Sequence, residues 1–250
     1  MFKTIINTAF ILLAFGEPLH GTVTVIKAKC EGGISIYGKV GVADITLEED
    51  SDKKSYKMKV ETSSIGLVKA LSFNRHDIFV SEGVIKDGLY LPHRFIKHTL
   101  KDDLDEMITY LLDYENKTLL KTTKVKKTKH YYGYDIQSFE IIPRQKIIET
   151  DESEYIDFQS NDFLTLYLNL KNNKLKTGNI SYIDKKDEDN LQLINKNLFE
   201  VQKDNGRTKY HISFLNDNGF LFKRAVALDI FFYGDAYIEK LYEKTEIIHH

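Results

Sequence analysis

Tryptophan is missing from this sequence, and cysteine and proline are scarce, with one cysteine and three prolines in 250 residues. The single cysteine, Cys30, excludes an intrachain disulfide and therefore the framework of a disulfide-rich domain. Together with only 14 glycines, the prolines are too few for a Pro-rich or Gly-rich linker. We therefore expect one continuous globular unit without a flexible connection between domains.

The sequence also lacks a dominant charge and a long apolar run after its first residues. Lys and Arg number 35 against 37 Asp and Glu, so no global field attracts nucleic acid. No segment beyond the N-terminal region has 18 consecutive apolar residues, and no transmembrane segment is predicted in the mature chain. The 15 Tyr and 15 Phe favour a sheet-rich fold, because aromatic side chains suit pleated, half-buried positions.

The N-terminal region has the residue order of a secretory signal peptide. Lys3 precedes an apolar core from Ile5 to Phe15, and small residues follow. We expect residues 1–21 to be a signal peptide cut after Gly16 or Gly21. Residues 22–250 are then a single β-rich domain in the periplasm. A buried N-terminal strand is the alternative for the same apolar run.

Short alternating segments between turn signals predict antiparallel strands along most of the chain. The clearest alternation runs from Tyr56 to Glu61, with apolar and charged residues on opposite faces. Ile34 to Tyr37 is expected to continue the first strand, and Pro92 to end a strand or lie at a sheet edge. The acidic run Glu149–Glu154 is expected to be a loop. The predicted fold is mainly β.

The densest apolar run after the N-terminal region extends from Asp162 to Leu170. It fits helical spacing and strand alternation equally well, and under either pattern it belongs inside the protein. We interpret it as a short helix, begun by Ser160, Asn161 or Asp162 and ended by Asn172-Asn173, over which a curved sheet closes. The predicted buried plug segment comprises Phe163, Leu164, Leu166, Tyr167, Leu168 and Leu170.

Patterns that support catalysis or metal binding are missing. His93 and His98 are five residues apart, so on a strand they lie on opposite faces and do not share a metal. The sequence has no Gly-x-Ser-x-Gly motif, phosphate loop or dinucleotide glycine pattern. Cys30 lies among lysines, but a lone cysteine on a strand is more often a packing residue. We expect no catalytic, cofactor or metal residues and no enzymatic activity.

A basic run followed by tyrosines is the strongest candidate for a binding surface. Three interpretations are open: a solvated strand whose lysines block edge pairing, contact with anionic lipid headgroups, and contact with a protein partner. Nucleic acid is not expected for an exported chain. The candidate headgroup or partner surface comprises Lys121, Lys124, Lys126, Lys127, Lys129, Tyr131, Tyr132 and Tyr134.

Several landmarks, in this order, resemble an exported bacterial family catalogued as domain of unknown function three-one-zero-eight. They are Gly38-Lys39-Val40-Gly41-Val42-Ala43, Ser64-Ile65-Gly66-Leu67-Val68, Gly83-Val84-Ile85, Asp87-Gly88-Leu89 with Pro92, and Asp162-Phe163-Leu164-Thr165. That family looks like the lipoprotein-carrier type of fold. The resemblance therefore implies a strongly bent antiparallel sheet, an open or half barrel, with one or two short helices in its hollow.

These observations lead to two expectations about function. The first is a periplasmic protein that binds an apolar or amphipathic ligand, such as a lipid or a lipoprotein acyl chain, in the hollow of the sheet. The excess of Phe, Tyr, Leu and Ile without a polar constellation suits a mostly apolar site. The alternative is a cell-envelope scaffold or adaptor that binds another protein, with the hollow filled by its own helix.

Overall fold

The computed structural model describes residues 21–135, 137, 139–183, 189–195, 197–203, 209–228 and 235–249. The predicted signal peptide lies almost entirely outside the described residues. Two helices and 14 strands make up the described part, and their bounds follow here in chain order: β1 Thr22–Ile34, β2 Gly38–Asp50, β3 Ser55–Ser64, α1 Gly66–Leu71, β4 His76–Lys86, β5 Leu89–Lys101, β6 Leu104–Asp113, β7 Thr118–Asp135, β8 Glu140–Ile156, α2 Phe163–Lys171, β9 Gly178–Ile180, β10 Asp189–Asn195, β11 Leu198–Lys203, β12 Lys209–Asn216, β13 Phe222–Ala227, β14 Ala236–His249.

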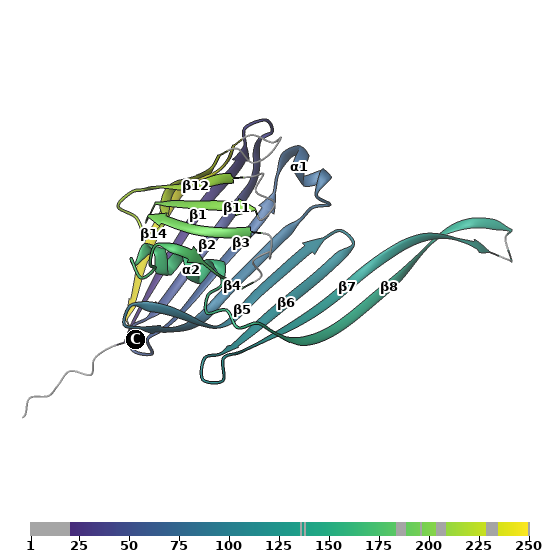
Figure 1. Ribbon diagram of the computed structural model, residues 1–250. Coiled ribbons are helices and arrows are strands. Elements are labelled where there is room, and N and C mark those ends of the chain that lie inside the picture. Colours follow the sequence, from purple (N-terminus) through teal and green to yellow (C-terminus); the bar gives the residue numbers. More distant parts are fainter. Residues whose placement is uncertain are drawn as a thin grey trace, which may run out of the picture.

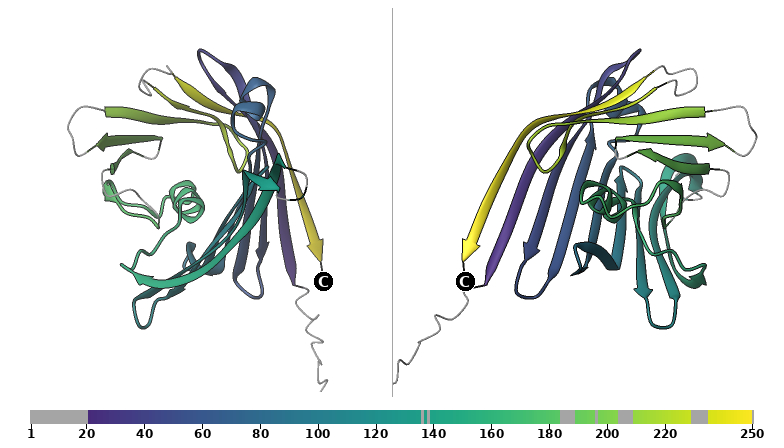
Figure 2. Two further views of the ribbon diagram at one scale, coloured as in Figure 1. Left: turned by 90° about the vertical axis from the view of Figure 1, so that its right-hand side faces the viewer. Right: turned by 60° about the vertical axis from the view of Figure 1, so that its left-hand side comes forward.

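The described strands form one antiparallel sheet in the order β8-β7-β6-β5-β4-β3-β2-β1-β14-β13-β12-β11-β10-β9. Every pairing joins strands that follow one another in the chain except β1 with β14, where Thr22 faces His249. The sheet bends strongly, so that β10–β13 and β5–β8 lie on opposite sides of α2 (Figures 1 and 2). The prediction of a mainly β chain with a bent, open antiparallel sheet is confirmed.

The core lies on the concave face of the sheet, which we call the hollow. On β3 the side chains of Tyr56 and Met58 are buried and Lys57 is exposed, as the alternation predicts. Neighbouring strands contribute Leu47, Phe95 and Tyr110 at matching positions, since alternate residues of each strand point to one face. The opposite face of the sheet stays largely in contact with solvent.

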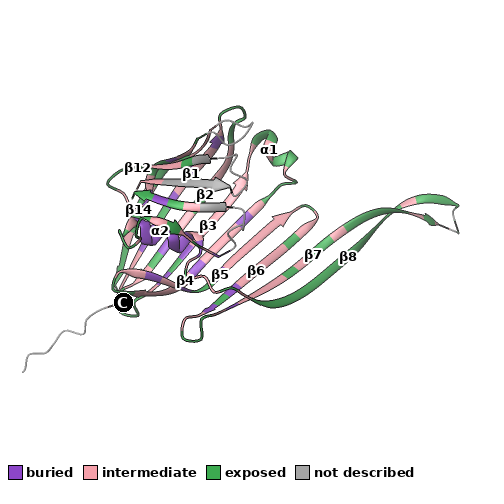
Figure 3. Ribbon diagram, in the orientation of Figure 1, coloured by how far each residue is buried: buried purple, intermediate pink, exposed green. Residues whose placement is uncertain are grey.

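Helix α2 lies in this hollow, and the sheet closes over it (Figures 1 and 3). Asp162 is its N-cap, and the side chain accepts hydrogen bonds from the backbone N–H groups of Leu164 and Thr165. The helix prediction for the plug segment is therefore confirmed. Leu164, Leu166, Leu168 and Leu170 are buried, while Phe163 and Tyr167 are partly buried and pack against the same core. Helix α1 lies instead at one end of the sheet.

The predicted loop at Glu149–Glu154 is wrong, because these residues belong to β8. They pair with β7 in an unbroken register from Leu119–Ile156 to Asp135–Glu140. The acidic run has no apolar alternation, so it carries no strand pattern of its own. Its partner strand supplies the stabilisation, since lysines of β7 lie directly opposite the acidic residues.

One further boundary prediction is wrong, and a second is correct only in one of its two alternatives. Strand β1 ends at Ile34, and the next three residues form a turn in which the N–H of Tyr37 donates to the carbonyl of Ile34 at 3.0 Å. Pro92 does not end β5, which continues through it, but it lies at a sheet edge, because the pairing of β5 with β6 begins only at Arg94. Pro92 is tolerated because it lies beside the bulge at Gly83 and before Arg94, where the pairing with β6 begins. The pairing of β1 with β2 contains an irregularity, because the register shifts between Gly32 and Gly33.

Candidate functional site

A buried polar cluster fixes the N-terminus of α2 against the sheet. The hydroxyl of Ser81 on β4 donates to Asp162 Oδ2 at 2.6 Å, and the hydroxyl of Thr165 donates to the same oxygen at 2.7 Å. Tyr56 on β3 lies 3.1 Å from both hydroxyls. Burial raises the pKa of the Asp162 carboxyl, and its four hydrogen bonds oppose this rise.

The middle of α2 is fixed by a second polar contact. The side-chain amide of Asn169 accepts a hydrogen bond from the N–H of Tyr90 at 2.8 Å and donates to the carbonyl of Tyr90 at 3.0 Å. Tyr90 lies on β5 before Arg94, where the pairing with β6 begins. Asn169 therefore completes the hydrogen bonding of a buried strand segment, in place of a neighbouring strand.

Aromatic side chains fill the remaining space between α2 and the sheet. The ring of Phe163 contacts Phe79 and Phe95 edge-on, with centroid distances of 5.0 Å and 5.4 Å. Tyr167 packs edge-on against Phe222 at 5.7 Å, and its hydroxyl accepts from the N–H of Phe222 and donates to the carbonyl of Phe220. The contacts of Phe163 show that the side of the hollow formed by β3–β6 is packed with protein side chains.

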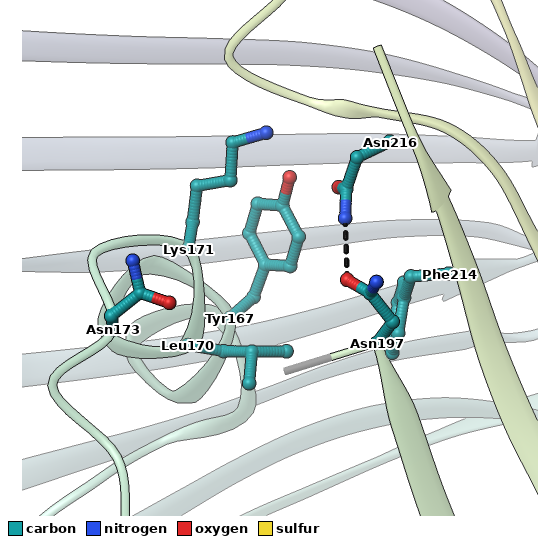
Figure 4. Close-up of a pocket in the computed structure, with 7 residues that line it drawn as sticks. All are labelled: Tyr167, Leu170, Lys171, Asn173, Asn197, Phe214 and Asn216. Atoms are coloured by element: carbon teal, nitrogen blue, oxygen red, sulfur yellow. Dashed lines mark hydrogen bonds between the residues drawn. The ribbon is translucent and has the colours of Figure 1, made fainter. Parts of the chain in front are cut away.

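A cavity of about 280 Å³ remains on the other side of α2, toward β12. The side chains that surround it are shown in Figure 4. Apolar groups line the cavity from both the α2 side and the β12 side, and amides and one ammonium group surround them. The side-chain amide of Asn216 donates a hydrogen bond to that of Asn197 at 2.7 Å. The cavity is lined by Tyr167, Leu170, Lys171, Asn173, Asn197, Phe214 and Asn216.

An ionic cluster holds the segment that leads into β13 beside this cavity. Lys240 on β14 lies 2.9 Å from Asp217 and 3.0 Å from Glu243, and only 9% of its side chain is exposed. Burial by itself raises the pKa of Glu243. The backbone N–H groups of Leu221 and Phe220 donate to this carboxylate and, with Lys240, hold its pKa below the usual range. The cluster therefore fixes the backbone that receives the Tyr167 hydroxyl.

The structure divides the candidate headgroup or partner surface into two parts. Lys121, Lys124 and Lys126 form ion pairs with the acidic residues opposite them on β8, at 2.7 Å, 3.1 Å and 3.2 Å. These lysines are neutralised within the hairpin. Lys127 and Lys129 have no acidic residue opposite, since Ile148 and Lys146 occupy those positions.

The tyrosines of that surface do not share one face. Tyr132 and Tyr134 alternate with Tyr131, so they lie on the opposite side of β7 from Tyr131, Lys127 and Lys129. All three rings are exposed, Tyr132 the most at 79%. Sequence reasoning missed the β8 residues that complete the two faces. Only the pairing of β8 with β7 shows which residues these are, because the run Ile141–Lys146 has no strict alternation of its own.

Sequence reasoning also missed Ser81, Thr165 and Asn169, the polar groups around α2. Thr165 and Asn169 are four residues apart in an apolar run, which places both on one face of a helix. That spacing was a readable signal for buried polar contacts. Their partners lie on β4 and β5, at sequence distances that no local pattern reveals.

Comparison of the chain with family models, curated proteins and solved structures finds no match. The resemblance to the exported bacterial family therefore stays a prediction. In the part of the chain that the structure describes, no group of three or more His, Cys, Asp or Glu is arranged to hold a metal ion. No helix among the same residues is long and apolar enough to cross a membrane.

Proposed function

We propose that the protein binds an amphipathic molecule with a single apolar chain in the cavity beside α2. The observation that carries this proposal is the composition of the lining. Tyr167, Leu170 and Phe214 offer apolar contacts, and three asparagine amides with Lys171 offer polar ones. Small-molecule sites combine apolar walls with a few placed polar groups, and this lining offers both.

The volume of the cavity limits the ligand. About 280 Å³ lies just below the range of roughly 300–1,000 Å³ that is usual for such sites. The buried contacts of Asp162 and Asn169 fix α2, so enlarging the cavity requires breaking them. We therefore propose a ligand with one medium-length chain rather than a two-chain lipid. Lys171 favours an anionic head.

Native mass spectrometry of the detergent-free chain, with dodecanoate as the probe, tests this proposal. We expect one dodecanoate to bind, and Lys171→Glu to weaken its binding by placing a like charge beside the carboxylate. Lys174→Glu is the matched control, because Lys174 is exposed, lies three residues away and does not line the cavity. No uptake by the wild-type chain, or equal loss in both variants, would contradict the proposal.

The alternative function is an envelope scaffold or adaptor that binds another protein. The fixed position of α2 favours it, since the helix fills much of the hollow that a carrier needs open. A chain that takes up no dodecanoate but cross-links to one defined envelope protein would support this alternative. Neither function requires catalysis, and we propose a binding role rather than an enzymatic one.

The periplasmic location remains part of the proposal. It rests on Lys3, the apolar run and the small residues that follow it. N-terminal sequencing of the protein from its native host tests it. A first residue of Glu17 or Thr22 is expected, and a chain that begins at Met1 would contradict export.

A further inference from the structure

The β7–β8 hairpin extends beyond the rest of the sheet. The last residue of β7 that pairs with β6 is Lys127, opposite Leu104. Residues 128–135 of β7 and 140–147 of β8 continue as a two-stranded ribbon, which we call the arm (Figure 1). Figure 3 shows that the arm is largely exposed. A two-stranded ribbon has no core of its own, so its side chains are available to a partner.

One face of the arm is apolar. Residues directly opposite each other in the register share a face, which places Tyr132 with Pro143 and Tyr134 with Ile141. Tyr132, Tyr134 and Ile141 are 79%, 57% and 71% exposed. Phe139, at the end of the arm, is 75% exposed. We call Tyr132, Pro143, Tyr134 and Ile141 the apolar face.

The other face of the arm is basic in the half nearest the sheet, where Lys129, Arg144 and Lys146 lie, and acidic at its end, where Asp135 lies opposite Glu140. Lys129 lies directly opposite Lys146, and Arg144 lies opposite Tyr131 on the same side. Like charges that face each other across two strands destabilise the pair. Among the described residues, no acidic side chain forms an ion pair with Lys127, Lys129 or Lys146. The fold does not require this arrangement, because the hairpin below it neutralises Lys121, Lys124 and Lys126 with acidic partners.

Further apolar side chains are exposed at the end of the sheet from which the arm projects. Strands β1, β3 and β7 all run toward this end, which carries the β1–β2 turn, α1 and the arm. Ile36, Leu67, Leu71 and Phe73 are between 59% and 74% exposed there. These residues add apolar surface at the end of the sheet that carries the arm.

We propose that the arm docks on an anionic phospholipid surface. Elements with a basic face and an aromatic face lie in the membrane interface, where apolar groups enter the acyl boundary and cations contact headgroups. Tyrosine suits that depth. The long lysine and arginine side chains reach the headgroup plane from the opposite face of a thin ribbon. This proposal goes beyond the proposed ligand site, because the arm shares no residue with the cavity.

Sedimentation of the full chain with phosphatidylcholine vesicles, with and without phosphatidylglycerol, tests the proposal. We expect binding only to the anionic vesicles, and its loss at about 1 M salt, where the Debye length falls to roughly 3 Å. Lys129→Gln with Lys146→Gln should weaken binding roughly thirtyfold, at about 1 kcal/mol for each lysine. Tyr132→Ser, Tyr134→Ser and Ile141→Ser together should abolish it.

Matched controls separate the arm from general surface effects. Lys53→Gln with Lys54→Gln removes two exposed lysines from the β2–β3 turn, at the opposite end of the sheet. Leu241→Ser, Tyr242→Ser and Ile247→Ser remove three exposed apolar residues from β14. Both controls should bind vesicles like the wild type. All variants keep the same N-terminal segment, so differences between them report on the changed residues alone.

Three outcomes would overturn the proposal. They are a wild-type chain that stays in the supernatant with anionic vesicles, arm variants that bind as tightly as the wild type, and controls that lose as much affinity as the arm variants. Dodecanoate uptake by the arm variants is measured in parallel. Because the cavity is separate from the arm, uptake should be unchanged, and failure of one proposal is distinguishable from failure of the other.

Discussion

The hydroxyl of Ser81 donates a 2.6 Å hydrogen bond to the carboxylate of Asp162, which lies 81 residues further along the chain. Both side chains have no exposed surface. Asp162 also caps α2, so one carboxylate orders the helix and attaches it to β4. The position of the plug segment thus depends on a buried acid that sequence alone presents only as an N-cap candidate.

Replacing Asp162 should separate its roles. Asp162→Ala removes the cap and two hydroxyl contacts, and we expect it to lower the free energy of unfolding by about 2–4 kcal/mol. Asp162→Asn keeps an oxygen for the backbone N–H groups, and the hydroxyls of Ser81 and Thr165 rotate to accept from the amide, so the loss should be less than half. Urea denaturation measures both. Equal losses would show that the cap contributes little.

The pH dependence of stability should reveal the buried acid. Burial raises the pKa of Asp162 above its usual 3.8, so the folded state holds this proton at a pH where the unfolded state releases it. The stabilisation is complete below about 3.8 and is lost as pH rises through the folded pKa. The unfolding free energy of wild type minus that of Asp162→Asn should therefore fall as pH rises from about 3.8. A constant difference would contradict this.

Substitutions of Asn169 that preserve the size of its side chain should lower the stability of the folded chain. Asn169→Leu removes both hydrogen bonds to Tyr90 and leaves a buried N–H and carbonyl without partners, at a cost of about 2–4 kcal/mol. Asn169→Asp accepts from the N–H of Tyr90 but does not donate to its carbonyl, and it buries a charge. Thermal unfolding of both variants measures the effect. Wild-type stability in Asn169→Leu would show that this contact is dispensable.

Gly83 should not tolerate a side chain. A Cβ at this position would overlap the carbonyl oxygen of Leu91 and lie 2.8 Å from the Cα of Pro92, both in backbone. We expect Gly83→Ala to destabilise the chain by more than about 3 kcal/mol, since backbone strain is among the costliest single changes. Gly32→Ala is the control, because its nearest neighbour would lie 3.6 Å away. Equal urea midpoints for the two variants would contradict the expected clash.

Cys30 should be unreactive while the chain is folded. It has no exposed surface, and burial raises the pKa of its thiol to about 11, against the opposing effect of Lys240. At pH 8 little thiolate exists, and a disulfide reagent should react only after unfolding. Stability should also fall between about pH 9 and 11, where the unfolded thiol ionises first, and Cys30→Ala should lack this part of the loss. Rapid labelling of the native chain would contradict the assignment.

Alternation and turn signals predicted the class of fold, because most strands bury one face and expose the other. The hairpin around Tyr56 and Met58 follows this rule closely. The plug segment fitted both periods, and the sequence could not decide between them until its cap and the closing sheet were considered together. The loop prediction for Glu149–Glu154 failed for the opposite reason. This run forms a strand through cross-strand charge pairs that no single segment reveals.

The candidate binding residues were predictable in kind but not in arrangement. The lysine run was visible, but only the register of β8 shows which lysines are neutralised and which face another cation. The cavity beside α2 was not predictable at all, because its lining combines α2 with Asn197, between β10 and β11, and with Phe214 and Asn216 on β12. Contacts of that range depend on the bend of the whole sheet.

The pairing of β1 with β14 has a consequence for synthesis of the chain. Until residues 236–249 emerge, β1 has a neighbour only on the β2 side, and 13 residues of strand present an open edge. Such an edge is a template for pairing with another chain. A product truncated before Ala236 should therefore aggregate even though β2–β8 retain their neighbours. Strand β14 covers this edge of β1 and so prevents self-association, but it is the last strand to be synthesised.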